Sequence, residues 1–498
     1  MQMNISITQL EAIKKVVKWL IVIPASILSC AALSNELSIG KNDSLDLNAA
    51  VKIAVAIDPW LVGNKHSQDA IEAMSISAGT LPDPKVSIGV ANLPTDTFDI
   101  QQEAMTQTKV GVSQMFPRGD SRAIKKKQLE VMGSQYPYQR YDREAKVAMT
   151  VSQFWLDAYK AQESIALIEK DRSLFEQLAD VAEAAYSSAI GRTRQQDIVR
   201  ADLELIQLDD RLTVLKQQQE MYQERLSEWL SSYFADQYLI KGSVFNHTSD
   251  PTLKLTKKLP DIFLLNPQLY KSLTPIGQEI LANYLSEHPA VKGLDKKIQA
   301  TNIGIDLAKQ KYKPEWGVNA AYGYRDDDVF GKDRADLFSV GITFDLPIFT
   351  ANRQDNEYRA AVSQAESVKT EKWLLLRNMM ASFETAKAQL LRLNERQELY
   401  RSELLPQMYI QAEASLTAYT NDDGDFAEAV RARIAVLNAE IEALNIDVDR
   451  QKLIVRLNYL FVNQHSSIEM MLSDGSVAVK GNNQMNDKLS SKGVIHVE

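Results

Sequence analysis

The segment from Thr108 to Arg122 reads TKVGVSQMFPRGDSR, and it predicts a short alternating strand that ends at a proline and passes directly into a charged helix. The same layout returns at Val340–Arg353, VGITFDLPIFTANR, where Pro347 takes the place of Pro117 at an offset of 230 residues. Repeats must be found before single elements are assigned, because a missed repeat leads to the wrong fold. We therefore interpret the chain as two related halves.

Other positions repeat at nearly the same distance. Two further proline pairs lie 230 residues apart and a pair of turn glycines lies 233 apart, a drift that small insertions explain. These pairs are Pro59 with Pro289, Pro84 with Pro314, and Gly191 with Gly424. Several shared spacings in one order indicate an internal duplication. Each half is predicted as helix, strand, loop, strand, long helix, turn and returning helix.

Period-two alternation of apolar side chains predicts four strands, and long stretches without helix breakers predict the helices. The strands are expected at 85–91, 108–116, 316–324 and 337–346. In the first repeat, 35–232, helices are expected at 45–79, broken at Asp58-Pro59, at 120–185 and at 194–232. In the second repeat, 275–463, they are expected at 275–312 with Pro289 inside, at 352–417 with a bend at Pro406, and at 426–463. Residues 233–274 would form an equatorial insertion, and the polar tail 464–498 would be disordered.

The predicted strands suit a membrane, because a tilted strand of about nine residues crosses a bilayer. Lipid offers no partner to an open strand edge, and four strands are too few to close around a pore. Oligomerisation is therefore expected, and three copies would supply twelve strands. An ordinary sheet lying on a core is the alternative. The side chains expected to meet lipid are Val86, Ile88, Val90, Trp316, Val318, Tyr322, Tyr324, Phe338, Val340, Ile342 and Phe344.

The two longest predicted helices would each run for roughly 100 Å at 1.5 Å per residue, a length that a globular core does not need. Their apolar residues recur at alternating intervals of three and four, which indicates coiled-coil packing. The predicted seams are Leu174, Leu178, Val181 and Ala185, and Leu205, Leu208, Leu212 and Leu215. The predicted fold class is an α+β membrane protein, internally duplicated, with four transmembrane strands per chain and long coiled-coil helices.

Composition and the N-terminus bound the possible functions. The net charge of −9 argues against a nucleic-acid partner, and a single cysteine, Cys30, excludes intramolecular disulfides and cysteine-cluster metal sites. Three lysines precede an apolar run at 19–28 and small residues up to Ser34, the order of an export signal covering 1–34. Cleavage after Ser34 and lipidation of Cys30 both remain open.

The sequence lacks the residue patterns of common enzymes. It contains no HExxH, P-loop or GxSxG motif, and its five histidines are scattered singly. The pairs Met379-Met380 and Met470-Met471 invite a copper interpretation, but methionine on a helix usually serves packing. We expect no catalytic residue, cofactor or bound metal, and interpret the chain as a passive duct whose energy comes from a partner.

The duplicated order, the junctions VGVSQMFPRGDSR and VGITFDLPIFTANR, and the turns YSSAIGRT and YTNDDGD together resemble the TolC-type outer-membrane efflux proteins over residues 45–463. This resemblance implies a homotrimer with a twelve-stranded barrel in the outer membrane of a Gram-negative bacterium and an α-helical barrel through the periplasm. It also implies docking to a periplasmic adaptor and an inner-membrane pump of the RND type. Pro117 and Pro347 would mark where the barrel meets the helices.

The cargo is less constrained by the sequence. The segments LPDPKVSIGVANLP and SQMFPRGDSR of the first repeat are similar to the heavy-metal branch of the family, the CusC- and CzcC-like exporters. Heavy-metal cations are therefore the expected cargo, with drug efflux and type I protein secretion as alternatives. A function of another class, a periplasmic coiled-coil structural or tethering protein with a small water-soluble sheet, also remains open.

The two helical turns are the expected docking and gating end. One turn is basic and the other is acidic, so charge pairing between them could hold the entrance closed until an adaptor docks. Three copies of the acidic turn could also form a ring that favours cations. The usual alternative is that turn charges are simply solvated, since a surface ion pair contributes about 0–1 kcal/mol. The turn residues are Gly191, Arg192, Thr193, Arg194, Asp422, Asp423, Gly424 and Asp425.

Overall fold

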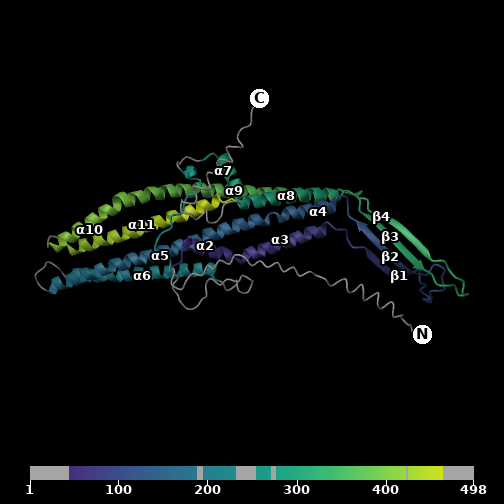
Figure 1. The fold of residues 1–498 in the computed structure, drawn as a ribbon, viewed down its shortest axis with the longest axis horizontal. Coiled ribbons are helices and arrows are strands. Elements are labelled where there is room, and N and C mark those ends of the chain that lie inside the picture. Colours follow the sequence, from purple (N-terminus) through teal and green to yellow (C-terminus); the bar gives the residue numbers. More distant parts are fainter. Residues whose placement is uncertain (1–43, 188–194, 232–253, 271–275, 422–423, 464–498) are drawn as a thin grey trace, which may run out of the picture. The chain divides into compact units, whose positions relative to one another are not determined.

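The computed structural model describes residues 44–187, 195–231, 254–270, 276–421 and 424–463. Within these ranges the elements follow the duplicated order predicted from the sequence (Figure 1). The first repeat holds α2 (Leu47–Ala56), α3 (Pro59–Ala78), β1 (Lys85–Ala91), β2 (Gln107–Phe116), α4 (Ser121–Gly133), α5 (Tyr136–Ser187) and α6 (Gln195–Leu230). The second holds α7 (Gln278–Ser286), α8 (Pro289–Gln310), β3 (Trp316–Tyr324), β4 (Leu337–Phe344), α9 (Gln354–Leu399), η2 (Tyr400–Leu404), α10 (Leu405–Thr420) and α11 (Phe426–Leu460). The expected signal peptide with Cys30 and the expected disordered tail lie outside the described residues.

The repeated prolines Pro59 and Pro289 each begin a helix. Proline fits the first helical turn because that position needs no N–H donor. The residue before each proline caps the helix: Asp58 accepts a hydrogen bond from the Trp60 N–H at 3.1 Å, and His288 Nδ1 accepts one from the Ala290 N–H at 3.2 Å. The prediction that Pro289 lies inside one helix over 275–312 is therefore wrong, since α7 ends at Ser286 and α8 begins at Pro289.

The strands form one antiparallel sheet in the order β1-β2-β3-β4, so β1 and β4 are its edges (Figure 1). In register, Val86 lies opposite Val112, and Val112 lies opposite Ala320. The observed strands β1 and β3 have the predicted limits, and β2 begins one residue earlier than predicted. Strand β4 was predicted to reach residue 346, but it ends at Phe344 because the side chain of Asp345 turns to the junction described below.

The first predicted long helix, 120–185, is divided in two. Helix α4 ends at Gly133, and α5 begins at Tyr136 with Pro137 as its second residue. Proline cannot donate to the preceding turn, and the glycine ahead of it weakens helix continuity. Helix α5 still spans 52 residues, about 78 Å at the standard rise.

The second predicted long helix, 352–417, contains a π-turn. Helix α9 ends at Leu399, η2 spans Tyr400–Leu404, and α10 carries Pro406 in its first turn. Leu405 donates its N–H to the Tyr400 carbonyl, the i to i−5 bond of a π-helix. Because Pro406 removes the next donor, the widened turn absorbs the irregularity at the position where the sequence predicted a bend.

The helices pack mainly as α5 on α6, α8 on α9, and α11 on α5, α9 and α10. The predicted seam of α6 packs in one apolar cluster with α5 and α11. Leu208 and Leu212 are buried in this cluster, and Leu205 and Leu215 are partly buried and pack against it. The predicted seam of α5 is wrong at Val181, which is 51% exposed and is not among the residues packed in that cluster. Leu174 packs against the cluster, and the side chains of Leu178 and Ala185 lie outside the described part of the chain.

The described part of the insertion, 254–270, lies as an extended segment against α5 and α11. Leu255 forms a parallel bridge with Leu45, whose carbonyl also accepts a hydrogen bond from Trp155 Nε1 at 3.1 Å. The buried Asn458 of α11 accepts from the Leu265 N–H at 2.8 Å and donates to the Phe263 carbonyl at 2.8 Å. Side-chain amides thus form the hydrogen bonds that these backbone groups would otherwise make within a helix or sheet.

His288 is held as a neutral imidazole. It is 1% exposed, its Nδ1 accepts from Ala290, and its Nε2 lies 3.1 Å from the Tyr459 carbonyl, so the ring proton must be on Nε2. A protonated Nδ1 could no longer accept this hydrogen bond, and its proton would repel that of the Ala290 N–H. Burial lowers the pKa of His288 to about 4, although the nearby carboxylate of Asp142 opposes this effect.

We expect acid to destabilise the chain through His288. Between about pH 6.5 and about pH 4 the unfolded chain takes up a proton that the folded chain does not, so the free energy of unfolding falls by about 3 kcal/mol as pH decreases through this window. His288→Asn, which can still cap α8, should lose less stability over the same window. Parallel curves of unfolding midpoint against pH for the two proteins would contradict this assignment.

Candidate functional site

One face of the sheet is apolar and exposed. Register places Val110 beside Ile88 and Tyr322, and Tyr322 beside Phe338, so apolar side chains of all four strands share this face. The predicted lipid-facing residues are all exposed, from 40% for Val318 to 77% for Ile88. Val110, Val112 and Phe116 extend the same face. A contiguous apolar patch of this extent marks an interaction surface, because water-soluble monomers rarely expose one.

The opposite face carries small and polar side chains. Gly111, Gly317 and Gly341 alternate there with serine, asparagine and threonine. A Cβ added at Gly317 would lie 2.6 Å from Thr343 Oγ1 and 2.7 Å from Met115 Sδ, so the side chains of the two neighbouring strands already occupy that space. The sheet therefore has one face suited to an apolar medium and one suited to water.

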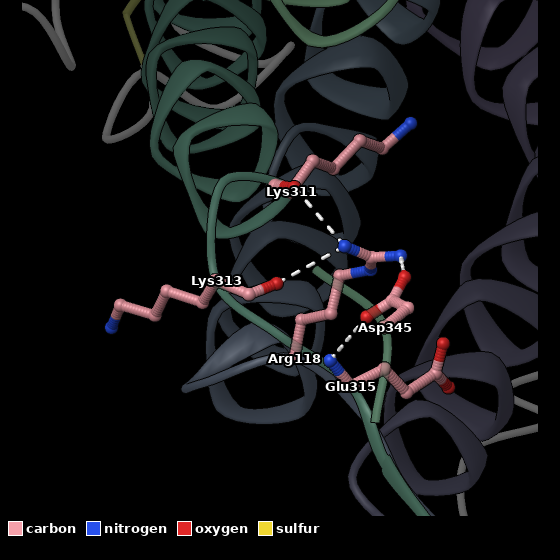
Figure 2. A network of polar contacts seen from close by, with 5 residues as sticks. All are labelled: Arg118, Lys311, Lys313, Glu315 and Asp345. Carbon is pink, nitrogen blue, oxygen red and sulfur yellow. Dashed lines mark hydrogen bonds and ion pairs between the residues drawn. The ribbon is translucent and has the colours of Figure 1, made fainter. Parts of the chain in front are cut away.

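Arg118 joins the strand–helix junctions of the two repeats (Figure 2). Its guanidinium donates to the carbonyls of Lys311 at 3.2 Å and Lys313 at 3.0 Å, and it also pairs with the Asp345 carboxylate. Asp345 in turn accepts from the Glu315 N–H at 2.7 Å. One side chain thus ties the start of α4 to the end of α8 and to both ends of the β3–β4 hairpin.

Pro117 and Pro347 lie between a strand and a helix, at the positions that the sequence analysis singled out. Pro117 follows β2 directly, and α4 begins four residues later. Gly119 between them has a φ of +45°, which favours glycine, and this turn directs the chain from strand to helix. Pro347 stands between β4 and α9 in a longer connection.

The hairpin turns are only partly described. Gly191, Arg192, Thr193, Arg194, Asp422 and Asp423 lie outside the described residues, so their proposed charge pairing stays a prediction. Asp425 caps α11 by accepting from the Ala427 N–H at 3.2 Å. Gly424 lies so close to the end of α10 that an added Cβ would be 2.6 Å from the Tyr419 N atom. These two residues therefore shape the turn.

The sequence analysis missed a line of polar contacts between α5 and α11, which connects the two repeats. Three carboxylates of α5, spaced 15 and 14 residues apart, each accept from a donor on α11. The contacts are Tyr459 Oη to Asp142 at 2.8 Å, Lys452 Nζ to Asp157 at 2.8 Å, and Arg433 Nη2 to Asp171 at 2.6 Å. Spacing by four helical turns on an otherwise apolar helix face was the available signal.

The contact nearest the hairpin turns is the most buried. Asp171 is 1% exposed, and both its Oδ2 and the Arg433 Nε lack a hydrogen-bond partner among the described residues. Tyr409 of α10 donates to Glu440 of α11 nearby. Burial and this hydrogen bond raise the pKa of Tyr409 to about 12, so the hydroxyl remains a donor at neutral pH. Here α5 of the first repeat is held to α11 of the second by a charge pair that lacks full hydrogen bonding.

No described helix combines the length and the apolar character needed to span a bilayer. No three His, Cys, Asp or Glu side chains of the described part are grouped closely enough to hold a metal ion.

Several solved structures have a similar fold at low sequence identity. The Campylobacter jejuni CmeC outer membrane channel aligns at 15% identity with a TM-score of 0.64, covering 91% of this chain and 94% of that one. CusC, a protein studied for folding and transmembrane channel formation, aligns at 13% identity with a TM-score of 0.65, covering 86% and 97%. The outer-membrane channel OprN aligns at 14% identity with a TM-score of 0.64, covering 83% and 89%.

No family model and no curated protein matches the sequence. The comparisons therefore establish a shared fold, in which helices and a small antiparallel sheet have the arrangement of these channel proteins.

Removal of the Arg118 side chain should loosen the junction. We expect Arg118→Met to lower the free energy of unfolding by about 1–3 kcal/mol, because two carbonyls and the Asp345 carboxylate lose a charged donor. Arg359→Met, at an exposed arginine of α9, is the matched control. A double-mutant cycle of Arg118→Met with Asp345→Asn, measured by chemical denaturation, would isolate the pair. An Arg118→Met protein as stable as the control would disprove the clamp.

Proposed function

We propose that this chain is the outer-membrane exit duct of a tripartite efflux system, a passive channel formed by three copies. The observation that carries the proposal is the two-faced sheet, which is apolar and exposed on one side and small and polar on the other. Such a sheet is stable where lipid covers its apolar face and water covers its polar face. The similarity in fold to outer-membrane channels supports the same reading.

Three copies would meet through the sheet edges. Strands β1 and β4 are the edges of each four-stranded sheet, and unpaired backbone groups cannot face lipid. Pairing β1 of one copy with β4 of the next three times would close a twelve-stranded barrel. The long helices would then continue as an α-helical barrel in the periplasm of a Gram-negative bacterium. In this arrangement Pro117 and Pro347 lie where membrane gives way to periplasm.

The hairpin turns are the proposed docking end for a periplasmic adaptor and an RND-type inner-membrane pump. Helix α5 alone is about 78 Å long, so its two ends lie far apart. The basic turn Gly191–Arg194 and the acidic turn Asp422–Asp425 would meet the partner proteins and help to close the entrance.

Heavy-metal cations are the proposed cargo, on the resemblance of the first repeat alone. CusC aligns no better than CmeC or OprN, so the fold does not favour metal over drug or protein cargo. A duct of this kind would leave the choice of cargo to its pump.

A charge on the apolar face tests the membrane placement. Val340 lies in the middle of β4 on the apolar face, and its neighbour Ser339 lies on the polar face. Val340→Arg should impair insertion into phospholipid vesicles, because arginine costs about 2–4 kcal/mol near the bilayer centre, whereas Ser339→Arg should insert and conduct.

Equal insertion of the two variants, or extraction of the wild-type chain without detergent, would reject the duct. The second outcome would favour a periplasmic tethering protein instead.

The buried pair Asp171–Arg433 is proposed to hold the closed state, since separation of the two helical hairpins must break it. Arg433→Ala leaves Asp171 buried and unpaired, which should destabilise the closed state by about 3 kcal/mol and raise the conductance measured in planar bilayers. Arg431→Ala is the matched control, since among the described residues the Arg431 side chain donates to the Ala427 carbonyl of its own helix, at 3.0 Å. The same conductance for both variants would exclude this pair as a gate.

A further inference from the structure

A cavity of about 280 Å³ lies where the strands meet the helices, next to the Arg118 clamp. It is formed by the β2–α4 turn, the end of α8, the residue before β3 and the first turn of α9. Its volume is near the lower limit for small-molecule sites. Charged lining residues of both signs set it apart from an ordinary packing defect. They are Arg118, Lys311, Glu315, Arg353 and Glu357.

Within the part of the chain that the structure describes, three of these five charged side chains are in ion pairs, and two are not. Arg118 pairs with Asp345, and Lys311 Nζ pairs with Glu357 at 2.9 Å. Among the described residues, the guanidinium of Arg353 and the carboxylate of Glu315 form no hydrogen bond or ion pair with another side chain. The cavity therefore presents one available cation and one available anion.

Gln354 adds an independent observation. It is only 7% exposed, it lines the cavity, and its Oε1 atom has no hydrogen-bond partner among the described residues. A buried amide oxygen without a donor costs about 1–3 kcal/mol. A ligand that supplies an N–H or O–H donor to this position would remove that penalty.

Two helix starts also meet the cavity. Helices α4 and α9 lack a side-chain cap, as do α7 and α10, whereas α2, α3, α8 and α11 each have one. The first turns of α4 and α9 contribute Ser121 and Gln354 to the lining. The partial positive charge of a helix start attracts anions, phosphate groups in particular, and it acts here although the Ser121 N–H already donates to the Arg118 carbonyl at 3.0 Å and the Asp355 N–H to the Thr350 carbonyl at 3.1 Å. Together with Arg353 they form an environment for an anion, and Glu315 with Gln354 forms one for a donor.

We propose that this cavity binds a phosphate that carries a primary amine, the chemistry of a phosphoethanolamine head group. Arg353 and the helix starts hold the phosphate, and Glu315 and Gln354 Oε1 accept from the ammonium. The cavity lies within a few residues of Phe116, Trp316 and Phe344, the aromatic side chains at one end of the apolar face. Aromatic residues of this kind gather at membrane interfaces, so a phospholipid is the expected source. This placement rests on the proposed function.

The test uses the full chain purified in detergent and titrated with phosphatidylethanolamine, with bound lipid counted by native mass spectrometry. The wild type should retain one lipid per chain. Arg353→Gln should weaken retention about tenfold, as expected for the loss of a charge-assisted hydrogen bond. Arg359→Gln, an exposed arginine of the same helix outside the lining, should bind like the wild type. Equal binding by the two variants would overturn the proposal.

Two further arms identify the ligand. Glu315→Gln should weaken phosphatidylethanolamine and leave phosphatidylglycerol, which has no amine, unchanged; equal weakening of both would refute the ammonium site. Millimolar inorganic phosphate should not displace the lipid, and ready displacement would show that free phosphate is the ligand. Thermal unfolding verifies that each variant is folded. Lipid binding is measured independently of membrane insertion and conductance. A chain that retains lipid but does not conduct would therefore reject only the proposed duct function. A chain that conducts but does not retain lipid would reject only the proposed lipid site.

Discussion

The apolar face of the sheet must be covered by something other than water, and the rest of the molecule is arranged around that requirement. A four-stranded sheet with both edges open and one face of valine, isoleucine and aromatic side chains is not stable by itself in an aqueous medium. No described helix of the chain packs on that face to cover it, as the exposure of Ile88, Phe338 and Val340 shows. In the proposed function, lipid would cover the face and further copies of the chain would pair with the edges.

The helical part has a different physical basis, because it is held by buried apolar contacts and paired charges within the chain. Helices α5 and α11 come from different repeats, and their contact contains Asp142, Asp157 and Asp171 with their donors. Burying a carboxylate is unfavourable unless it is paired, so these contacts select one register between the repeats. The tightest burial is at Asp171, toward the hairpin turns, where the charge pair is not fully hydrogen bonded.

The junction is where these two regimes meet. Strand backbone is satisfied by neighbouring strands and helix backbone by its own turns, so a chain that changes from one to the other leaves groups unpaired on both sides. Arg118 satisfies the carbonyls at the end of α8, and Asp345 satisfies an N–H before β3. The starts of α4 and α9 have no side-chain cap, and the charges of Arg353 and Glu315 have no side-chain partner in the described part of the chain; both sets of groups line one cavity.

The sequence by itself determined the duplication, the location of the four strands to within two residues and the face of each strand, because these depend on the spacing of residues along the chain. Period-two alternation located β1 and β3 at their observed limits, and Pro59 marked a helix boundary, whereas Pro289 was predicted inside a helix and in fact begins one. Only the tertiary structure decided how the halves meet. It pairs Asp171 with Arg433 and Arg118 with Asp345, which are far apart in the chain. It also leaves Val181 exposed. Spacing along one helix fixes which side chains share a face, but the neighbour that the face meets depends on packing between helices, which local spacing does not contain.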